Sequence, residues 1–167
     1  MISIEPLSPR IAAQFKAVRL RALADSPAAF GSTFEQESQL SDADWERRVT
    51  TWNSGRSVCS IAIEGGSPCG MAAGKCEDGQ PQRAWLLSMW VASAHRRSGL
   101  GVRLVHAVEQ WARALGVNEL LLMVTNSNSA AIGFYERCGF SLTGNTAPYP
   151  NDPALLEFEM AKSLRDA

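Results

Sequence analysis

The feature that most constrains the fold is a change of hydrophobic period near residue 57. From there, three runs rich in β-branched and apolar residues follow one another with short gaps, as consecutive β-strands do. The gaps contain Gly65-Gly66 and Asp78-Gly79, and Asp-Gly is a strong hairpin signal. The sequence therefore predicts hairpin-linked strands at 57–64, 69–77 and 82–91.

A helix and a buried strand follow the hairpins. One apolar stripe, typical of a helix packed on a core, predicts a helix over about 101–115 that Gly116 ends. The stripe consists of Leu100, Leu104, Val108, Trp111 and Leu115. Residues 119–125, ELLLMVT, are almost continuously apolar, which indicates a strand covered on both faces.

The flanking segments supply further helices and strands. Residues 2–5 can form a first strand, and Ser8 followed by Pro9 predicts a helix that runs to about residue 24. Pro27 and Gly31 interrupt the chain. Ser41 and Asp44 form a capping-box pattern, which predicts a second helix to about residue 52.

After the buried strand, a short helix is expected from near Asn128 to Gly139. Two closing strands are expected at 141–144 and 154–160, with a proline-rich loop at 146–153 between them. These elements predict one α+β domain over 1–167, with a mixed, mostly antiparallel sheet of about six or seven strands flanked by helices.

Composition narrows the classes of protein. The 167 residues are 46% apolar and carry a net charge of −1, with no Lys/Arg block longer than two, so we expect no nucleic-acid surface. No charged leader and no apolar run of about 18 residues is present, so we expect no signal peptide, no membrane span and a cytoplasmic location. The cysteines lack a CxxC pair, and we expect reduced thiols and no metal site. They are Cys59, Cys69, Cys76 and Cys138.

The stretch HRRSGLG, residues 95–101, lies where a buried strand hands over to a helix. Gly99 and Gly101 let the backbone come close to a ligand, and the first N–H groups of the helix have no intrahelical partner. With Arg96 and Arg97 beside them, these groups favour a phosphate. A tight turn with solvated arginines is the alternative at this point.

Two common nucleotide-binding motifs do not fit this loop. A dinucleotide-binding G-x-G-x-x-G would need glycine where GLGVRL has Leu104. A P-loop, G-x-x-x-x-G-K-[ST], occurs nowhere in the chain.

A third motif does fit. VASAHRRSGLG resembles the acetyl-CoA signature of the GNAT superfamily of N-acetyltransferases, V-x-x-x-x-R-x-x-G-x-G/A, at Val91, Arg96, Gly99 and Gly101. Further along, NSAAIGFYERCGF resembles the family's N-x-x-A-x-x-x-Y-E-x-x-G-F. The matching residues are Asn128, Ala131, Tyr135, Glu136, Gly139 and Phe140.

The resemblance implies that the strand ending at Val91 and the strand 119–124 form a central splayed pair that holds the pantetheine arm of acetyl-CoA. Backbone groups of Met89 and Val91 would contact this arm, and N–H groups from Arg97 to Val102 would bind the diphosphate. The cofactor-binding residues expected on this basis are Met89, Trp90, Val91, Arg96, Arg97, Ser98, Gly99, Leu100, Gly101, Val102, Asn128 and Tyr135.

Catalytic roles follow less directly. The second motif implies that Tyr135 protonates the departing CoA thiolate, whereas the residue alone reads as a core aromatic. Asn128 could cap its helix or bind a pantetheine amide. Some family members carry a glutamate on the strand before the signature, but this chain has Ser88 there, so Glu35 and Glu37 are the next candidate bases, or else part of a solvated helix face.

The expected function is transfer of an acetyl group from acetyl-CoA to a primary amine of a small molecule or peptide, within one ternary complex. A non-catalytic CoA-binding regulatory or interaction module is one alternative, and a transferase for another acyl-CoA is a second. Folds of this kind often dimerise, which leaves a homodimer open. The sequence does not identify the acceptor.

Overall fold

The computed structural model describes residues 1–166. Its strands are β1 (Ile2–Pro6), β2 (Ser57–Glu64), β3 (Ser67–Glu77), β4 (Gln80–Val91), β5 (Glu119–Thr125), β6 (Ser141–Tyr149) and β7 (Asp152–Ser163). Its α-helices are α1 (Ala12–Asp25), α2 (Phe34–Ser38), α3 (Asp42–Thr51), α4 (Leu100–Ala114) and α5 (Ser129–Arg137). Single 3₁₀ turns lie at η1 (Pro9–Ile11), η2 (Pro27–Ala29) and η3 (Ser93–His95).

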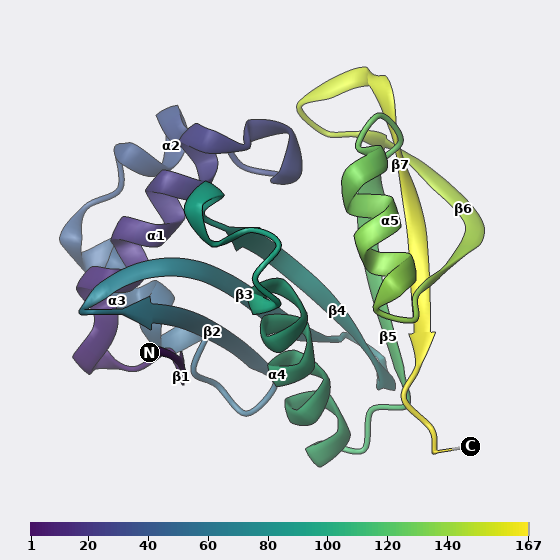
Figure 1. The fold of residues 1–167 in the computed structure, drawn as a ribbon, viewed down its shortest axis with the longest axis horizontal. Helices are drawn as coiled ribbons and strands as arrows, with labels where there is room; N and C mark the ends of the chain where they lie inside the picture. The colour runs from purple at the N-terminus through teal and green to yellow at the C-terminus, as the bar shows by residue number, and fades with distance from the viewer. Residues whose placement is uncertain (167) are drawn as a thin grey trace.

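The strands form one seven-stranded sheet in the order β1-β2-β3-β4-β5-β7-β6 (Figure 1). Every neighbouring pair is antiparallel except β4 and β5, which are parallel and joined through α4. The predicted α+β class and the mostly antiparallel sheet are therefore confirmed.

The sheet opens between β4 and β5. Their parallel pairing joins Arg83–Trp85 to Glu119–Leu121, yet β4 continues to Val91 and β5 to Thr125. On its other edge β4 carries a bulge, because two of its residues, Ser88 and Met89, lie opposite one residue of β3. Ser88 has a φ of +54°, a conformation that residues other than glycine rarely adopt. The expected splayed pair is present, and the bulge lies beside its opening.

Helices cover the two faces of the sheet. Alternate residues of a strand point to opposite faces, and on β3 Gly74 lies under Trp111 of α4, whereas Met71 and Ala73 share a cavity with Phe15 of α1. The helices α4 and α5 therefore cover one face, and α1 with α2 and α3 covers the other (Figure 1). The core lies between these layers and the sheet.

Some element boundaries differ from the expectation. The proline-rich loop predicted at 146–153 was wrong: β6 runs to Tyr149 and β7 begins at Asp152, with a tight turn between them. Pro148 fits because β6 is the edge strand, where a missing N–H costs no ladder bond. The interrupted segment after α1 contains a helix, α2, which a Thr33–Gln36 capping box begins.

At the helix starts, the predicted capping box of Ser41 and Asp44 is confirmed. Ser8 precedes the 3₁₀ turn η1 and makes no side-chain cap, and Pro9 occupies the first position of that turn, which leads into α1. Among residues 1–166, no helix combines the length and apolar character needed to cross a membrane.

Candidate active site

The loop between β4 and α4 leads into backbone N–H groups that have no partner within the helix. Gly99 precedes α4 in the left-handed region, with φ +84°, and the first bond of the helix runs from Arg103 N–H to the Gly99 carbonyl, at 3.1 Å. The N–H groups of Leu100, Gly101 and Val102 come before that bond and lie at the positive end of a 15-residue helix. This is the arrangement that binds a phosphate.

The loop is held by its own side chains. Ser98 Oγ donates to the His95 carbonyl, and His95 Nε2 lies 2.8 Å from Glu64 Oε2. His95 therefore anchors the loop to β2. Arg97 is exposed and has a φ of +61°, so the backbone turns left-handed twice within three residues.

Arg96 differs from the expectation that its side chain reaches phosphate. Its Nε donates to the Val91 carbonyl at 2.9 Å and its Nη2 to Asp25 Oδ2 at 2.6 Å. The same oxygen accepts from Trp90 Nε1 at 3.0 Å. Hydrogen bonds from Trp90, Ser26 and Arg96, opposed by desolvation, hold the pKa of Asp25 below its usual value. Arg96 thus ties the loop to α1.

Trp90 was expected among the cofactor contacts. Its indole is buried on the α1 face of the sheet, where it bonds to Asp25 and carries the Arg21 guanidinium 5.4 Å from its ring centroid. Only its backbone therefore remains for a ligand in the opening.

The first turn of α4 meets β4 and α5 at the opening. A Cβ added at Gly101 would lie 3.0 Å from the Phe134 ring and 3.3 Å from the Met89 methyl group. Any larger residue at 101 would push these side chains apart. Phe134 was not predicted as a site residue, and its only signal was its place between Gly133 and Tyr135 in the second motif.

Helix α5 begins and ends with residues of the second motif. Asn128 Oδ1 accepts from the Ala131 N–H at 3.1 Å, so the capping role is present and its Nδ2 group remains for another partner. The Tyr135 ring packs edge-on against Phe134 and Phe140, at 5.3 and 5.9 Å between centroids. Burial, with a smaller effect of Cys138, raises the pKa of Tyr135 well above its usual value.

A cavity of about 330 Å³ lies on the other face of the sheet, under α1, α2 and α3. It reaches the β4 bulge, where Arg19 Nη1 donates to Ser88 Oγ at 2.9 Å. Its lining residues are Phe15, Arg19, Ser32, Glu37, Arg48, Trp52, Cys59, Met71, Ala73 and Ser88.

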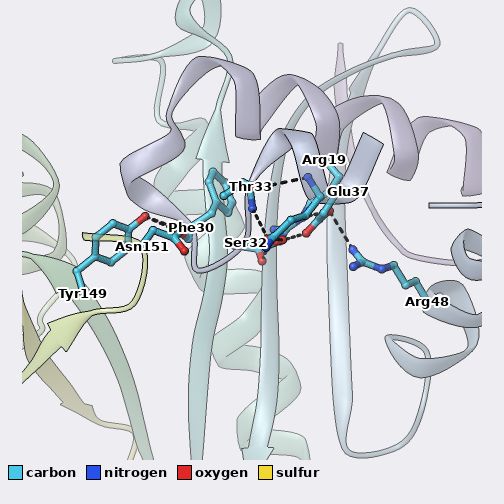
Figure 2. Close-up of polar contacts among 10 residues, drawn as sticks. Arg19, Phe30, Ser32, Thr33, Glu37, Arg48, Tyr149 and Asn151 are labelled. Atoms are coloured by element: carbon cyan, nitrogen blue, oxygen red, sulfur yellow. Dashed lines mark hydrogen bonds and ion pairs between the residues drawn. The ribbon is translucent and has the colours of Figure 1, made fainter. Parts of the chain in front are cut away.

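Glu37 lies in this cavity between two arginines (Figure 2). Arg19 binds it through Nε and Nη2, at 2.9 and 2.7 Å, and Arg48 Nη1 lies 2.9 Å from Oε2. Burial disfavours the carboxylate, but the hydrogen bonds and charge of Arg19 and the charge of Arg48 outweigh it and lower the pKa of Glu37.

This arrangement changes the expected role of Glu37. The alternative of a solvated helix face was wrong for this residue, because its side chain is only 2% exposed. A carboxylate with both oxygens engaged and a lowered pKa is a weak proton acceptor. Glu35 lies exposed on α2, and its catalytic role stays a prediction.

Glu157 on β7 was not singled out from the sequence. It pairs with Thr125 of β5 and Ala147 of β6, which places it on the face of the sheet that α1 covers, at the end of β5 that borders the opening. Burial raises its pKa. The alternation in EFEM puts Glu157 and Glu159 on one face, but the sequence does not say which face that is.

The turn between β6 and β7 holds the segment after α1 in place (Figure 2). The Tyr149 hydroxyl donates to the Phe30 carbonyl at 2.6 Å, and Asn151 Nδ2 lies 3.2 Å from the same oxygen. Residues far apart in the chain thus form one wall beside the cavity.

The cysteines are free thiols in the structure. Cys59, in the cavity lining, is buried, and burial raises its pKa to about 12. Within residues 1–166, no three His, Cys, Asp or Glu side chains lie close enough together to hold a metal ion.

Proteins named as acetyltransferases share parts of this sequence. N-acetyltransferase family 8 member 7 of Mus musculus is 35% identical over 100 residues, which are 58% of this chain and 44% of the mouse protein. The L-methionine sulfoximine/L-methionine sulfone acetyltransferase of Pseudomonas aeruginosa is 37% identical over 57 residues, 34% of this chain and 33% of that protein. The matched segments span less than half of either relative.

Solved structures share the whole fold. An acetyltransferase of the GNAT family from Streptococcus pneumoniae superposes with a TM-score of 0.80 at 21% identity, over 98% of this chain and 99% of that one. A protein from Salmonella typhimurium solved with its cofactor acetyl-CoA gives 0.78 at 18% identity, over 100% and 96%. The family model for the acetyltransferase (GNAT) family matches residues 20–140. The chain therefore belongs to the GNAT family of acetyltransferases.

Proposed function

We propose that the protein transfers an acetyl group from acetyl-CoA directly to a primary amine of a small molecule. The observation that carries this proposal is the opening between β4 and β5. On one face it meets the N-terminus of α4, and on the other it meets the cavity beside Ser88. Donor and acceptor can thus approach from opposite faces and meet at the bulge.

The residues around the opening suit CoA. The N–H groups of Leu100, Gly101 and Val102 would donate to the diphosphate, and exposed Arg97 would add positive charge. Beyond Trp85 the β4 edge that faces β5 is unpaired, so Met89 and Val91 can offer backbone groups to the amides of the pantetheine arm. The Salmonella structure with acetyl-CoA supports the same donor here.

The reaction needs the amine in its neutral form. For an amine of pKa about 10.4, deprotonation at pH 7 costs about 4.6 kcal/mol, since each pKa unit is worth about 1.36 kcal/mol. Glu157 fits the task of accepting this proton better than Glu37, because burial raises its pKa whereas the two arginines lower that of Glu37. We therefore assign the base to Glu157.

The remaining steps balance bonds and charge. The nitrogen attacks the thioester carbonyl, whose oxygen a backbone N–H of Met89 or Trp90 polarises. As the C–N bond forms and the C–S bond breaks, the sulfur takes a proton from the Tyr135 hydroxyl. The second proton, which the attacking nitrogen loses, returns to the Tyr135 phenolate through solvent. Burial raises the pKa of Tyr135, so the hydroxyl carries its proton at neutral pH. Tyr135 therefore acts as the acid.

Two measurements test the proposal. Calorimetry with CoA should detect binding, and thiol release from acetyl-CoA should require an added amine from a panel of amino acids, polyamines, aminoglycosides and peptides. Binding without thiol release for any amine would favour a non-catalytic CoA-binding module instead. Faster thiol release from propionyl-CoA or a longer acyl-CoA than from acetyl-CoA would show that the preferred donor is not acetyl-CoA.

The base has its own test. Glu157→Gln should lower kcat by about 100-fold, the lower end of the range for general acid–base catalysis. Glu159→Gln is the matched control, because Glu159 lies on the same face two residues away and instead accepts from Thr143 Oγ1 at 2.9 Å. Equal, small effects of both substitutions on kcat would remove Glu157 from the mechanism.

A further inference from the structure

We propose that the acceptor is a free amino acid, or a small amine that likewise bears a carboxylate next to the amine, and that Arg48 with Arg19 binds this carboxylate. The inference rests on the proposed acetyl transfer and names its substrate class. It starts from the charge of the cavity under α1, α2 and α3.

The cavity has a surplus of positive charge. Its lining contains the two guanidinium groups of Arg19 and Arg48 and one carboxylate, Glu37. The side chains of Arg19 and Arg48 are 12% and 32% exposed, so water screens them only in part. Because one carboxylate cannot neutralise two guanidinium groups, an anion entering the cavity would gain a charge-assisted contact.

Arg48 has the capacity for that contact. Within residues 1–166 its side chain makes one hydrogen bond, from Nη1 to Glu37, whereas a guanidinium carries five N–H donors. Its guanidinium also lies 5.2 Å from the centroid of the Trp45 ring, a cation–π contact that helps to hold the group. A planar, held guanidinium with spare donors suits the two oxygens of a carboxylate.

Arg19 is likewise held by an aromatic ring, and it extends from the positively charged part of the cavity to the β4 bulge. It lies 4.9 Å from the Phe30 ring centroid, grips Glu37 with two donors and gives a third to Ser88 at the bulge. A carboxylate bound beside Arg19 and Arg48 would thus lie near the place where we put the acetyl group. In an amino acid bound this way, the amine on the carbon next to the carboxylate would lie close to the thioester.

The cavity also disfavours the other acceptor classes. A cationic polyamine would meet two arginines, and Glu37 is already neutralised by them. The volume of about 330 Å³ lies at the small end of the usual range for ligand pockets, roughly 300–1,000 Å³. Phe15, Trp52 and Met71 give it an apolar part, which suits an uncharged side chain. A peptide has no carboxylate beside its N-terminal amine.

The first experiment compares matched acceptors by thiol release from acetyl-CoA. Leucine, methionine and phenylalanine are each measured against their carboxamide and their decarboxylated amine, which keep the side chain and the amine. We expect kcat/KM for at least one of these acids to exceed that of its carboxamide by about 10- to 100-fold, the usual value of a hydrogen bond to a charged group. Equal or better rates with the carboxamides or with peptides would overturn the inference.

The second experiment changes the arginine. Arg48→Gln should remove most of the preference for the acid over the amide, through the acceptor KM, while Arg48→Lys keeps part of it. Arg47→Gln is the control, because Arg47 is the next residue of α3, is exposed and pairs with Asp44 outside the cavity. Calorimetry with CoA and a thermal melt show whether each variant is folded.

The outcomes separate this inference from the proposed function. A preference for acids that Arg48→Gln abolishes and Arg47→Gln leaves intact supports the carboxylate site. Amine acetylation without that preference, or an equal loss for acids and amides in Arg48→Gln, refutes the site and leaves the acetyl transfer standing. Absence of thiol release with every amine, although CoA binds, refutes the acetyl transfer and this inference with it.

Discussion

The two sides of the β4–β5 opening are built in different ways. On the α4 side, the loop 95–101 and the first turn of α4 are continuous in the chain and present mainly backbone groups. On the α1 side, Arg19, Glu37, Arg48 and Ser88 come from four separate elements and meet through side chains. The donor side is therefore fixed by local sequence, and the acceptor side by long-range contacts.

This difference has a functional consequence. Backbone N–H groups of a helix start recognise a diphosphate whatever the neighbouring side chains are. Side chains gathered from distant elements can change one at a time, so the acceptor can change without loss of the donor site. Substitutions on the α4 side should therefore alter CoA binding or the transfer step, and those on the α1 side should alter acceptor binding and stability.

The largest expected effect is on stability, at Glu37. Glu37→Gln leaves two half-buried guanidinium groups without their common carboxylate, and breaking such a buried pair costs about 3–5 kcal/mol. For a chain of this size the melting temperature should fall by about 10 °C. Differential scanning calorimetry measures this, and Glu46→Gln, at an exposed position of α3, should change it by no more than about 1–2 °C.

The same residue gives a pH dependence. The pKa of Glu37 is lower in the folded protein than its ordinary value of 4.5. Its stabilising contribution is therefore complete above pH 4.5 and is lost as the pH falls through the folded pKa. Urea denaturation at a series of pH values should show a steeper loss in acid for the wild type than for Glu37→Gln. Parallel curves would show that Glu37 does not contribute through its charge.

The next largest effect is on turnover, at Tyr135. Tyr135→Phe removes the proton donor and keeps the ring that packs on Phe134 and Phe140, so kcat should fall about 100-fold while the Kd for CoA changes less than twofold. Single-turnover rates test this where the transfer step limits. Unchanged rates would leave Tyr135 as a packing residue.

The sequence predicted the donor side better than the acceptor side, for a physical reason. Gly99 and Asn128 act through local backbone geometry, which a motif records. The burial of Glu37 between Arg19 and Arg48, and the placement of Glu157, depend on which strands and helices meet in space. Neither spacing nor local pattern encodes that.

The fold followed the same rule. Period and turn signals predicted the hairpins and the helix α4, and the family resemblance predicted the splayed strands. The proline-rich stretch instead forms strand because it lies at the sheet edge. Arg96 also illustrates the limit. The motif identified Arg96, but it could not predict the bond to Asp25, because the two residues are 71 positions apart in the sequence.

A smaller effect is expected at Gly99, on CoA binding. Gly99→Ala places a side chain at φ +84°, which costs about 1–2 kcal/mol, so the loop should shift and the Kd for CoA should rise about tenfold. Gly116→Ala introduces the same strain at φ +79°, at the other end of α4. Calorimetry should show weaker CoA binding only for Gly99→Ala. Equal binding in both variants would mean that the loop does not hold the diphosphate.

The smallest effect is expected at Tyr149, which joins the β6–β7 turn to the segment after α1. Tyr149→Phe removes the donor to the Phe30 carbonyl but leaves the one from Asn151, so the loss should be about 1 kcal/mol. Amide hydrogen exchange should then rise in residues 27–33, and the acceptor KM should rise a few-fold with the CoA Kd unchanged. Asn151→Ala, which keeps the shorter bond, should have less effect on both. A change in CoA affinity instead would show that the two sides of the opening are coupled through this wall.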